Sequence, residues 1–130
     1  MGRVYQMRLR YLVDTRILLW VLNADSRLSE HHRDIFLSGK DVTISAISVA
    51  EIAIKKSLGK IALTANIVDV LRSNGMPILG VNELHAARLE YLPLHHRDPF
   101  DRLLIAQAQI EGLTLVTSDR HFSAYDVALA

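Results

Sequence analysis

The stretch DPFDRLLIAQAQIEGLTLVTS, residues 98–118, decides the fold class because a complete helix in it leads into a short buried strand. Pro99 stands at the first position of the helix predicted over 98–112, where its fixed φ is favourable and its missing N–H costs nothing. The apolar run 114–118 then predicts a strand that is covered on both faces. A helix that leads directly into such a strand is typical of α/β proteins.

The same alternation extends toward the N-terminus. Ser29 and Gly39 have the positions of an N-cap and a C′ residue around one predicted helix, and Ser48 and Glu51 have the spacing of a capping box. Short apolar strands between helices predict a three-layer α/β/α domain with a central parallel sheet. The further strands are expected at 9–13, 42–45 and 76–81, and the further helices at 15–22, 29–39, 48–59, 64–75 and 82–92.

Length and composition narrow the function classes. The chain has 130 residues, so we expect one domain over 1–130, with 1–7 as a flexible tail and Met7 as an alternative start. A net charge of +1 excludes nucleic-acid binding by bulk charge alone. The absence of cysteine excludes a disulfide framework and a thiolate zinc site, and fits the cytoplasmic location that we expect. The apolar runs are too short to span a membrane, and the N-terminus does not have the pattern of a secretory signal.

Motifs for three common kinds of site are missing. The first strand is followed by Asp14-Thr15-Arg16 and not by a G-x-G-x-x-G turn, and no complete P-loop is present. The G-x-S-x-G turn of serine hydrolases is also missing. The sequence therefore gives no support for a dinucleotide site, a Walker-type nucleotide site or a serine nucleophile.

Acidic residues follow the predicted strands or begin the helices after them. Because the carboxyl ends of parallel strands meet at one edge of a sheet, we expect these side chains to lie together. Two carboxylates ~4 Å apart repel by roughly 4 kcal/mol at an effective dielectric near 20, so such a cluster needs a cation or a shared proton. Oxygen ligands favour Mg²⁺ or Mn²⁺, which activate water for phosphodiester cleavage. The five residues are Asp14, Glu51, Asp98, Asp101 and Asp119.

Each acid also has a structural interpretation. Glu51 can complete a capping box, and Asp98 can be the N-cap of the helix that begins at Pro99. Asp101 lies in a first helical turn, where the helix dipole favours a carboxylate, and Asp119 can cap the turn in SDRHF. Asp14 is the hardest to explain structurally, because a charge at the end of a buried strand is costly without a partner.

Basic side chains and histidines accompany these acids. His95 and His96 are adjacent, so in an extended loop they face opposite ways, and no third ligand has the spacing of a zinc site; we do not expect them to bind metal. The basic stretch after Glu51 is better explained as a solvated helix end than as a set of phosphate contacts; it contains Lys55, Lys56 and Lys60. Arginine outnumbers lysine, which favours bidentate phosphate binding. The candidate phosphate contacts are Arg16, Lys55, Arg97, Arg102 and Arg120.

Four segments of the chain, in order, resemble the PIN domain, specifically VapC-type toxins of bacterial toxin–antitoxin pairs. They are YLVDTRILLWVL (11–22), ISAISVAEIAIKKSLGKI (44–61), LPLHHRDPFDRLLIAQAQIEGLTLVTSD (92–119) and the RHF that follows. The resemblance implies a parallel α/β sheet and a Mg²⁺-dependent ribonuclease, in which Mn²⁺ substitutes. It also implies inhibition by a small antitoxin protein translated from the same operon.

The resemblance also assigns roles to residues. Asp14, Glu51, Asp101 and Asp119 match the family's four acids in that order, and they would hold one or two Mg²⁺. Asp98 belongs to the HRDPFD variant and would support the metal site. Thr15, Ser48 and Thr117 match the small hydroxyl residues beside the acids.

One position departs from this pattern. Relatives of this type commonly have His where this chain has Arg16. Its guanidinium either binds substrate phosphate or neutralises the acids and lowers their metal affinity, and the sequence leaves both open.

The sequence pattern is also compatible with other functions. A housekeeping RNA-processing or flap nuclease would share the acids, whereas a receiver-like module would use Asp14 as a phosphorylation site. The receiver interpretation calls for paired early acids and a lysine after the strand at 114–118, and a dehalogenase-like phosphatase would need Asp at position 16; neither is present. The apolar helical segments 15–29 and 67–75 predict a homodimer, which would also bind an antitoxin segment across the groove that leads to the acids.

Overall fold

The computed structural model describes residues 9–38 and 41–130, so the tail expected at 1–7 and the C′ position of Gly39 lie outside the described residues. Four parallel strands form one sheet in the order β3-β2-β1-β4. Leu12 at the centre pairs with Thr43 on one side and with Leu115 on the other. The strands are β1 (Arg10–Val13), β2 (Asp41–Ser45), β3 (Ile78–Leu79) and β4 (Thr114–Val116).

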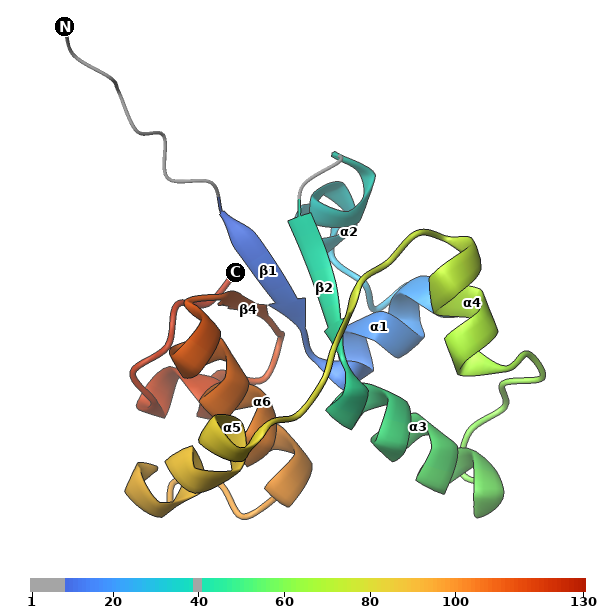
Figure 1. Cartoon of the computed structure of the whole chain (residues 1–130). Helices are drawn as coiled ribbons and strands as arrows, with labels where there is room; N and C mark the ends of the chain where they lie inside the picture. The colour runs from blue at the N-terminus through green and yellow to red at the C-terminus, as the bar shows by residue number, and fades with distance from the viewer. Residues whose placement is uncertain (1–8, 39–40) are drawn as a thin grey trace, which may run out of the picture.

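Helices cover both faces of this sheet. In Figure 1, α1, α2 and α4 lie on one side of the strands and α5 and α6 on the other, while α3 starts at the carboxyl end of β2 and contacts α1, α4 and α6. The predicted α/β/α architecture with a parallel sheet is confirmed. The helices are α1 (Thr15–Leu22), α2 (Glu30–Leu37), α3 (Ala46–Ser57), α4 (Ile67–Ser73), α5 (Glu83–Arg88) and α6 (Pro99–Glu111), with short 3₁₀ turns η1 (Leu89–Tyr91) and η2 (Arg120–Ala124).

Alternation along the strands divides the core in two. Tyr11 and Val13 face one cluster of apolar side chains, together with residues from α1, α2, α3 and α4. Leu12, between them, faces a second cluster that contains most of the apolar side of α6. Side chains alternate between the two faces of a strand, so each face of the sheet has its own cluster. Because all the strands are parallel, their carboxyl ends lie at the same edge of the sheet.

Polar side chains at the strand ends start the helices. Ser29 and Asp98 are the N-caps of α2 and α6, as predicted. The capping box predicted for Ser48 and Glu51 is wrong, because α3 begins at Ala46 and its N-cap is Ser45. Both predicted residues therefore lie in the body of the helix, on its buried side.

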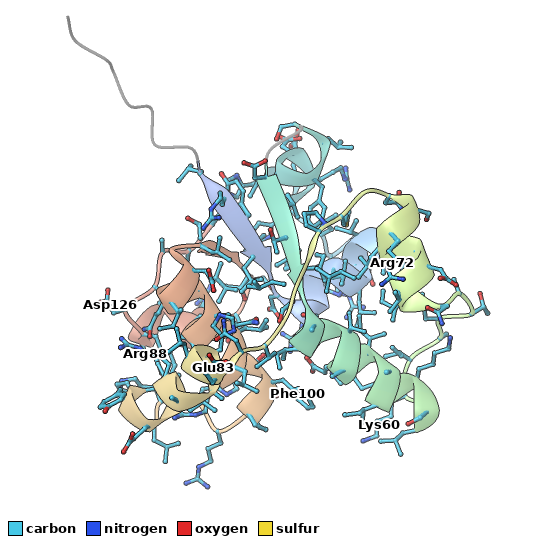
Figure 2. The ribbon with its side chains drawn as sticks, viewed as in Figure 1. Lys60, Arg72, Glu83, Arg88, Phe100 and Asp126 are labelled. Carbon is cyan, nitrogen blue, oxygen red and sulfur yellow. The ribbon has the colours of Figure 1, made fainter. Side chains whose placement is uncertain are left out.

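Two other predicted segments are shorter than expected. The strand predicted over 76–81 forms only the two residues of β3, because Pro77 has no N–H to donate to a longer ladder. The helix predicted over 64–75 begins only at Ile67, where the Asn66 side chain accepts from two backbone N–H groups. Figure 2 shows the side chains on the ribbon, with the exposed Lys60 beyond the end of α3 and the exposed Arg72 on α4. None of the described helices is long and apolar enough to cross a membrane.

Candidate active site

A pocket of about 200 Å³ opens at the carboxyl end of the sheet, where the body of α3 and the starts of α1 and α6 lie beside the acids that follow β1 and β4. The structure brings all five predicted acids together there, which confirms that the strand ends converge. The lining residues are Asp14, Thr15, Arg16, Leu19, Glu51, Lys55, Asp98, Asp101 and Asp119.

Asp14 connects the end of β1 to the start of α1. One carboxylate oxygen accepts from the backbone N–H of Arg16 at 3.3 Å, and the other accepts from the Thr117 hydroxyl at 2.9 Å. Burial raises the pKa of Asp14 above its ordinary value, despite these hydrogen bonds. The Thr117 hydroxyl also accepts from the backbone N–H of Asp119 at 3.0 Å, so it holds two of the acids in place.

Glu51 projects from α3 into the same pocket and is only 7% exposed. Its Oε2 lies 3.0 Å from the Lys55 ammonium, one helical turn away. Its Oε1 has no hydrogen-bond partner. Within residues 9–38 and 41–130, every other buried side-chain nitrogen or oxygen has one. The Thr15 hydroxyl donates to Ser48 at 2.8 Å and thereby fixes α3 against the start of α1. A buried carboxylate oxygen without a donor is costly, so this atom calls for a cation or a proton.

Asp98 and Asp101 begin α6. Asp98 Oδ1 accepts from the backbone N–H of Phe100 at 2.9 Å and of Asp101 at 3.4 Å, so its predicted capping role is confirmed. Burial, together with the charges of the other four acids, raises the pKa of Asp101 to about 7. Near neutral pH, Asp101 is therefore divided between its protonated and charged forms, and a cation in the pocket would favour the charged form.

Asp119 caps η2, as predicted for the turn SDRHF. One of its oxygens accepts from the backbone N–H of His121 at 2.9 Å and lies 2.9 Å from the ring Nδ1 of the same residue. Burial acts to raise the pKa of Asp119, but the contacts with His121 and the nearby His96 more than offset it, and the pKa is lowered. The pocket thus combines an acid that resists ionisation with one that favours it, an arrangement common at catalytic sites.

His96 also belongs to this cluster. Its Nε2 lies 3.1 Å from Asp101 Oδ2 and 3.7 Å from Asp119 Oδ2. The two adjacent histidines do face different surroundings, since His95 packs edge-on against Tyr125. Neither histidine was predicted to bind metal, because no third ligand has a suitable spacing in the sequence. In the fold, however, Asp101 and Asp119 lie beside His96. The usable signal was a polar ring two residues before the N-cap of the acid-bearing helix.

The predicted phosphate contacts divide into three groups. Arg16 and Lys55 line the pocket; Arg16 is exposed and forms no ion pair with the acids in the part of the chain that the structure describes. Arg97 and Arg120 are exposed and do not line it. Arg102 donates to the carbonyl of Pro93 at 2.9 Å and to other groups of the loop before α6. Its guanidinium therefore stabilises this loop.

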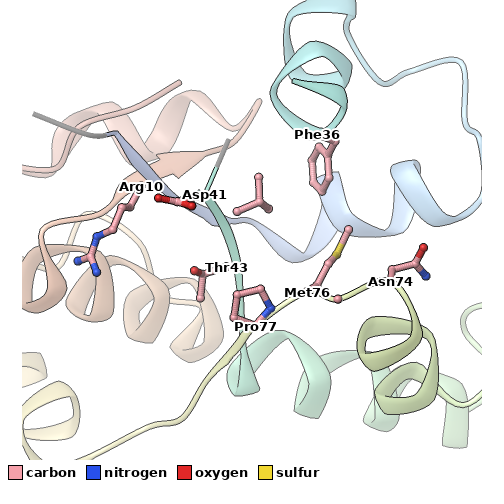
Figure 3. Close-up of a pocket in the computed structure, with 9 residues that line it drawn as sticks. Arg10, Phe36, Asp41, Thr43, Asn74, Met76 and Pro77 are labelled. Atoms are coloured by element: carbon pink, nitrogen blue, oxygen red, sulfur yellow. The ribbon is translucent and has the colours of Figure 1, made fainter. Parts of the chain in front are cut away.

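The donor set fits a hard divalent cation. It consists of carboxylate oxygens from four separate elements, and it includes one buried oxygen without a partner. The larger pocket shown in Figure 3, about 430 Å³ at the opposite end of β1 and β2, has no such concentration of acids. Arg10, Thr43 and Met76 are among its lining residues, and the single carboxylate among them is that of Asp41. Of these two pockets, the one at the carboxyl end has the donor set suited to a divalent cation.

A family model for the PIN domain matches residues 11–128, and the chain belongs to this family. The most similar solved structures include FitAcB from Neisseria gonorrhoeae, with 25% identity over 92% of this chain and 95% of that chain and a TM-score of 0.67. The structure of VapBC2 from Rickettsia felis, bound to a DNA fragment from the promoter, shows 17% identity over 94% of this chain and 98% of that chain, with a TM-score of 0.69. A toxin–antitoxin complex from Klebsiella pneumoniae is 18% identical over 92% and 95%, with a TM-score of 0.66. No curated protein matches the sequence.

Proposed function

We propose that this chain is a divalent-metal-dependent endoribonuclease and the toxin of a toxin–antitoxin pair. One observation carries the enzymatic part: Glu51 Oε1 is buried without a hydrogen-bond partner in a pocket that four further carboxylates line. Such an oxygen is stabilised by a cation, and a cation among carboxylates at the strand ends is suited to phosphodiester chemistry. Membership of the PIN domain family supports the same function.

The acids would hold the ion, and their neighbours keep the acids in place. Asp14, Glu51, Asp101 and Asp119 supply oxygen ligands for Mg²⁺, with Mn²⁺ as a substitute. A bound divalent ion supplies Lewis acidity that activates water and stabilises charge on the phosphodiester. Thr117 holds Asp14 in a fixed orientation through the 2.9 Å hydrogen bond.

The cations at the pocket rim would bind the RNA backbone. Arg16 and Lys55 both line the pocket, and the Lys55 side chain is 42% exposed. The ammonium can therefore leave Glu51 for a phosphate oxygen once a metal ion satisfies that carboxylate. Arg16 presents a planar group suited to bidentate phosphate contact. Neither side chain carries base specificity, so both are expected to bind RNA of any sequence.

Cleavage assays test the enzymatic part directly. Purified protein should cleave single-stranded RNA with Mg²⁺ or Mn²⁺, and EDTA should abolish the cleavage, because the acids provide no nucleophile of their own. Single-stranded DNA and flap DNA serve as matched substrates. Preferred cleavage of flap DNA would support the housekeeping nuclease instead. A stable phosphoryl group on Asp14 after treatment with a small phosphodonor, without any cleavage, would support the receiver-like module.

The toxin role adds a protein partner. Solved structures similar to this chain include a toxin–antitoxin complex from Klebsiella pneumoniae. An anionic pocket can accept a cationic side chain from an inhibitor in place of the metal. We expect a small antitoxin with a basic side chain that enters the pocket. It should be encoded in the adjacent reading frame, co-purify with the chain and inhibit cleavage. The proposed substrate, RNA, places this activity in the cytoplasm. Failure of the adjacent product to bind would favour the housekeeping nuclease.

We further propose a homodimer. Apolar side chains gather at one hollow beside α1 and α2, where Val21, Leu28, Phe36 and Leu37 are among the lining residues and Leu37 is 76% exposed. Side chains of this kind on a small domain favour an interface. Light scattering of the isolated chain is expected to give the mass of two copies, and a monodisperse monomer would contradict it.

A further inference from the structure

His96 lies in the loop that leads to α6, and its ring lies beside two members of the acid cluster, Asp101 and Asp119. The ring Nε2 is 3.1 Å from Asp101 Oδ2, and its centroid is 5.8 Å from that of His121 and 6.1 Å from that of Phe122. The side chain is 19% exposed, so it is largely enclosed by these neighbours.

The other ring nitrogen determines what Nε2 can do. The backbone N–H of Asp98 donates to His96 Nδ1 at 3.1 Å, so Nδ1 presents its lone pair. In the neutral ring the proton then resides on Nε2, which makes Nε2 a hydrogen-bond donor toward Asp101. Ligand atoms of His96, Asp101 and Asp119 lie within 4.8 Å of one another, as in a three-ligand metal site. Coordination through Nε2 would nevertheless require a proton on Nδ1, where it would oppose the Asp98 N–H.

The loop backbone is fastened independently of the ring. The Tyr125 hydroxyl accepts from the backbone N–H of His95 at 3.1 Å and of His96 at 2.7 Å. Arg102 donates to the Pro93 carbonyl at 2.9 Å and to the His96 carbonyl at 3.4 Å. Hydrogen bonds on both sides of His96 therefore fix where its ring lies before any ion binds, as is usual for groups that hold metal ligands in place.

We propose that His96 is a positioning residue: its Nε2–H holds Asp101 Oδ2, so that the other oxygen of Asp101 is left for the cation. The 3.7 Å approach to Asp119 Oδ2 places the same N–H between the acids of α6 and of the loop after β4. The inference rests on the proposed metal-dependent function and assigns a role within that site. A histidine that acted only as a counter-ion would instead compete with the metal, which predicts a change of affinity in the opposite direction.

Calorimetric titration of Mn²⁺ into the protein, without RNA, separates the two roles. His96→Leu removes the donor, whereas His96→Gln keeps an N–H at a similar reach, and His95→Leu is the matched control in the exposed neighbour. We expect His96→Leu to weaken Mn²⁺ binding by ~10- to 100-fold, the usual effect of losing a hydrogen-bond partner of a metal ligand. His96→Gln should restore affinity to within a few-fold of wild type, and His95→Leu should leave it unchanged.

Three results would overturn the inference: tighter Mn²⁺ binding by His96→Leu, equal affinities for the Leu and Gln variants, or an equal loss in His95→Leu. Thermal unfolding without metal shows which variants are folded. If His96→Leu does not fold, Tyr125→Phe loosens the same loop without altering the ring, and unchanged Mn²⁺ affinity in that variant would also overturn the inference. A wild-type protein that neither binds Mn²⁺ nor cleaves RNA would refute the proposed function, a result distinct from all of these.

Discussion

Helix α6 contributes to two buried polar clusters that differ in how fully their hydrogen bonds are satisfied. Near its start, Asp101 faces the acid pocket, in which Glu51 Oε1 has no partner. Further along, Gln107 accepts a short hydrogen bond from Ser45 and donates to the Gly80 carbonyl at 3.3 Å. Each cluster combines buried side chains with half-buried ones, so burial alone does not explain the contrast. The first cluster contains the buried Asp14 and Glu51 with the half-buried Asp101 and Asp119, and the second contains the buried His85 and Gln107 with the half-buried Glu111.

The second cluster is closed on itself. His85, fully buried, accepts from the backbone N–H of Asn82 at 3.1 Å and pairs with Glu111 at 2.9 Å through its other nitrogen. A network in which each group has a partner rigidifies the fold, whereas a cluster with excess charge and an unpartnered oxygen is less stable than it could be. The comparison teaches that satisfaction of hydrogen bonds, more than burial, separates the structural polar residues from the functional ones.

The largest expected effect is the loss of cleavage in Asp101→Asn. The substitution keeps the shape of the side chain but removes an ionic oxygen ligand, so we expect RNA cleavage to fall by at least about 100-fold. The metal-free variant should be as stable as the wild type or more stable by about 1 kcal/mol, because like-charge repulsion is relieved. Cleavage rates and urea unfolding measure the two effects. Unfolding of the variant, with no effect of metal on the wild type, would mean that the acids are structural.

The second largest effect is the opposite one: a substitution in the second cluster should lower stability and leave cleavage nearly unchanged. Gln107→Leu leaves the buried Ser45 hydroxyl without its acceptor, so we expect a loss of roughly 2–3 kcal/mol in the free energy of unfolding. Cleavage per folded molecule should stay within a few-fold of wild type, because Gln107 does not line the pocket. Urea unfolding and rates measured well below the unfolding midpoint check both parts. Lost cleavage with unchanged stability would show that the two clusters are not separate in function.

A smaller effect is expected from pH. The pKa of Asp101 is raised to about 7 in the folded protein from an ordinary 3.8, so the folded state holds this proton more tightly than the unfolded state. The resulting stability is fully present below the ordinary pKa and is lost as the pH rises through about 7. Between about pH 5 and pH 8 the metal-free wild type should therefore lose about 1 kcal/mol more than Asp101→Asn, a figure reduced for partial solvent exposure.

Parallel urea titrations of the two proteins at both pH values measure this difference. Saturating Mn²⁺ should reduce it, because the ion replaces the proton as the partner of Asp101. Identical pH dependence of wild type and variant would mean that Asp101 does not hold the additional proton.

The sequence predicted that the acids lie together because their placement follows from topology. Strands of one parallel sheet end at the same edge, so Asp14 and Asp119 must approach each other once β1 and β4 pair. The start of α3 was predicted incorrectly because Ser45 and Ser48 are both good N-caps, and only the length of β2 decides between them. Local patterns were sufficient for which elements form, but not for every boundary.

Residues positioned by distant contacts could not be predicted in this way. His96 enters the acid cluster because the Tyr125 hydroxyl, 29 residues further along the chain, fixes the loop backbone. Gln107 and His85 are both fully buried, although their polar side chains indicate an exposed position when only their own helices are considered. In both cases the deciding contact lies between elements, and no spacing within one segment carries that information.

The smallest effect distinguishes the two interpretations of Arg16. Its charge opposes the rise that burial causes in the pKa of Asp14, yet its side chain is exposed and forms no ion pair with the acids among the described residues. Arg16→His replaces a permanent cation by a ring that is mostly neutral near pH 7, so Mn²⁺ affinity should rise by ~2- to 5-fold, as a screened charge at a pocket rim predicts. If the guanidinium also binds RNA, the KM for RNA should rise in the same variant while kcat is retained. Calorimetric titration of Mn²⁺ and steady-state cleavage kinetics give the two values separately. Equal Mn²⁺ affinities with an unchanged KM would show that Arg16 points away from the acids and takes no part in the site.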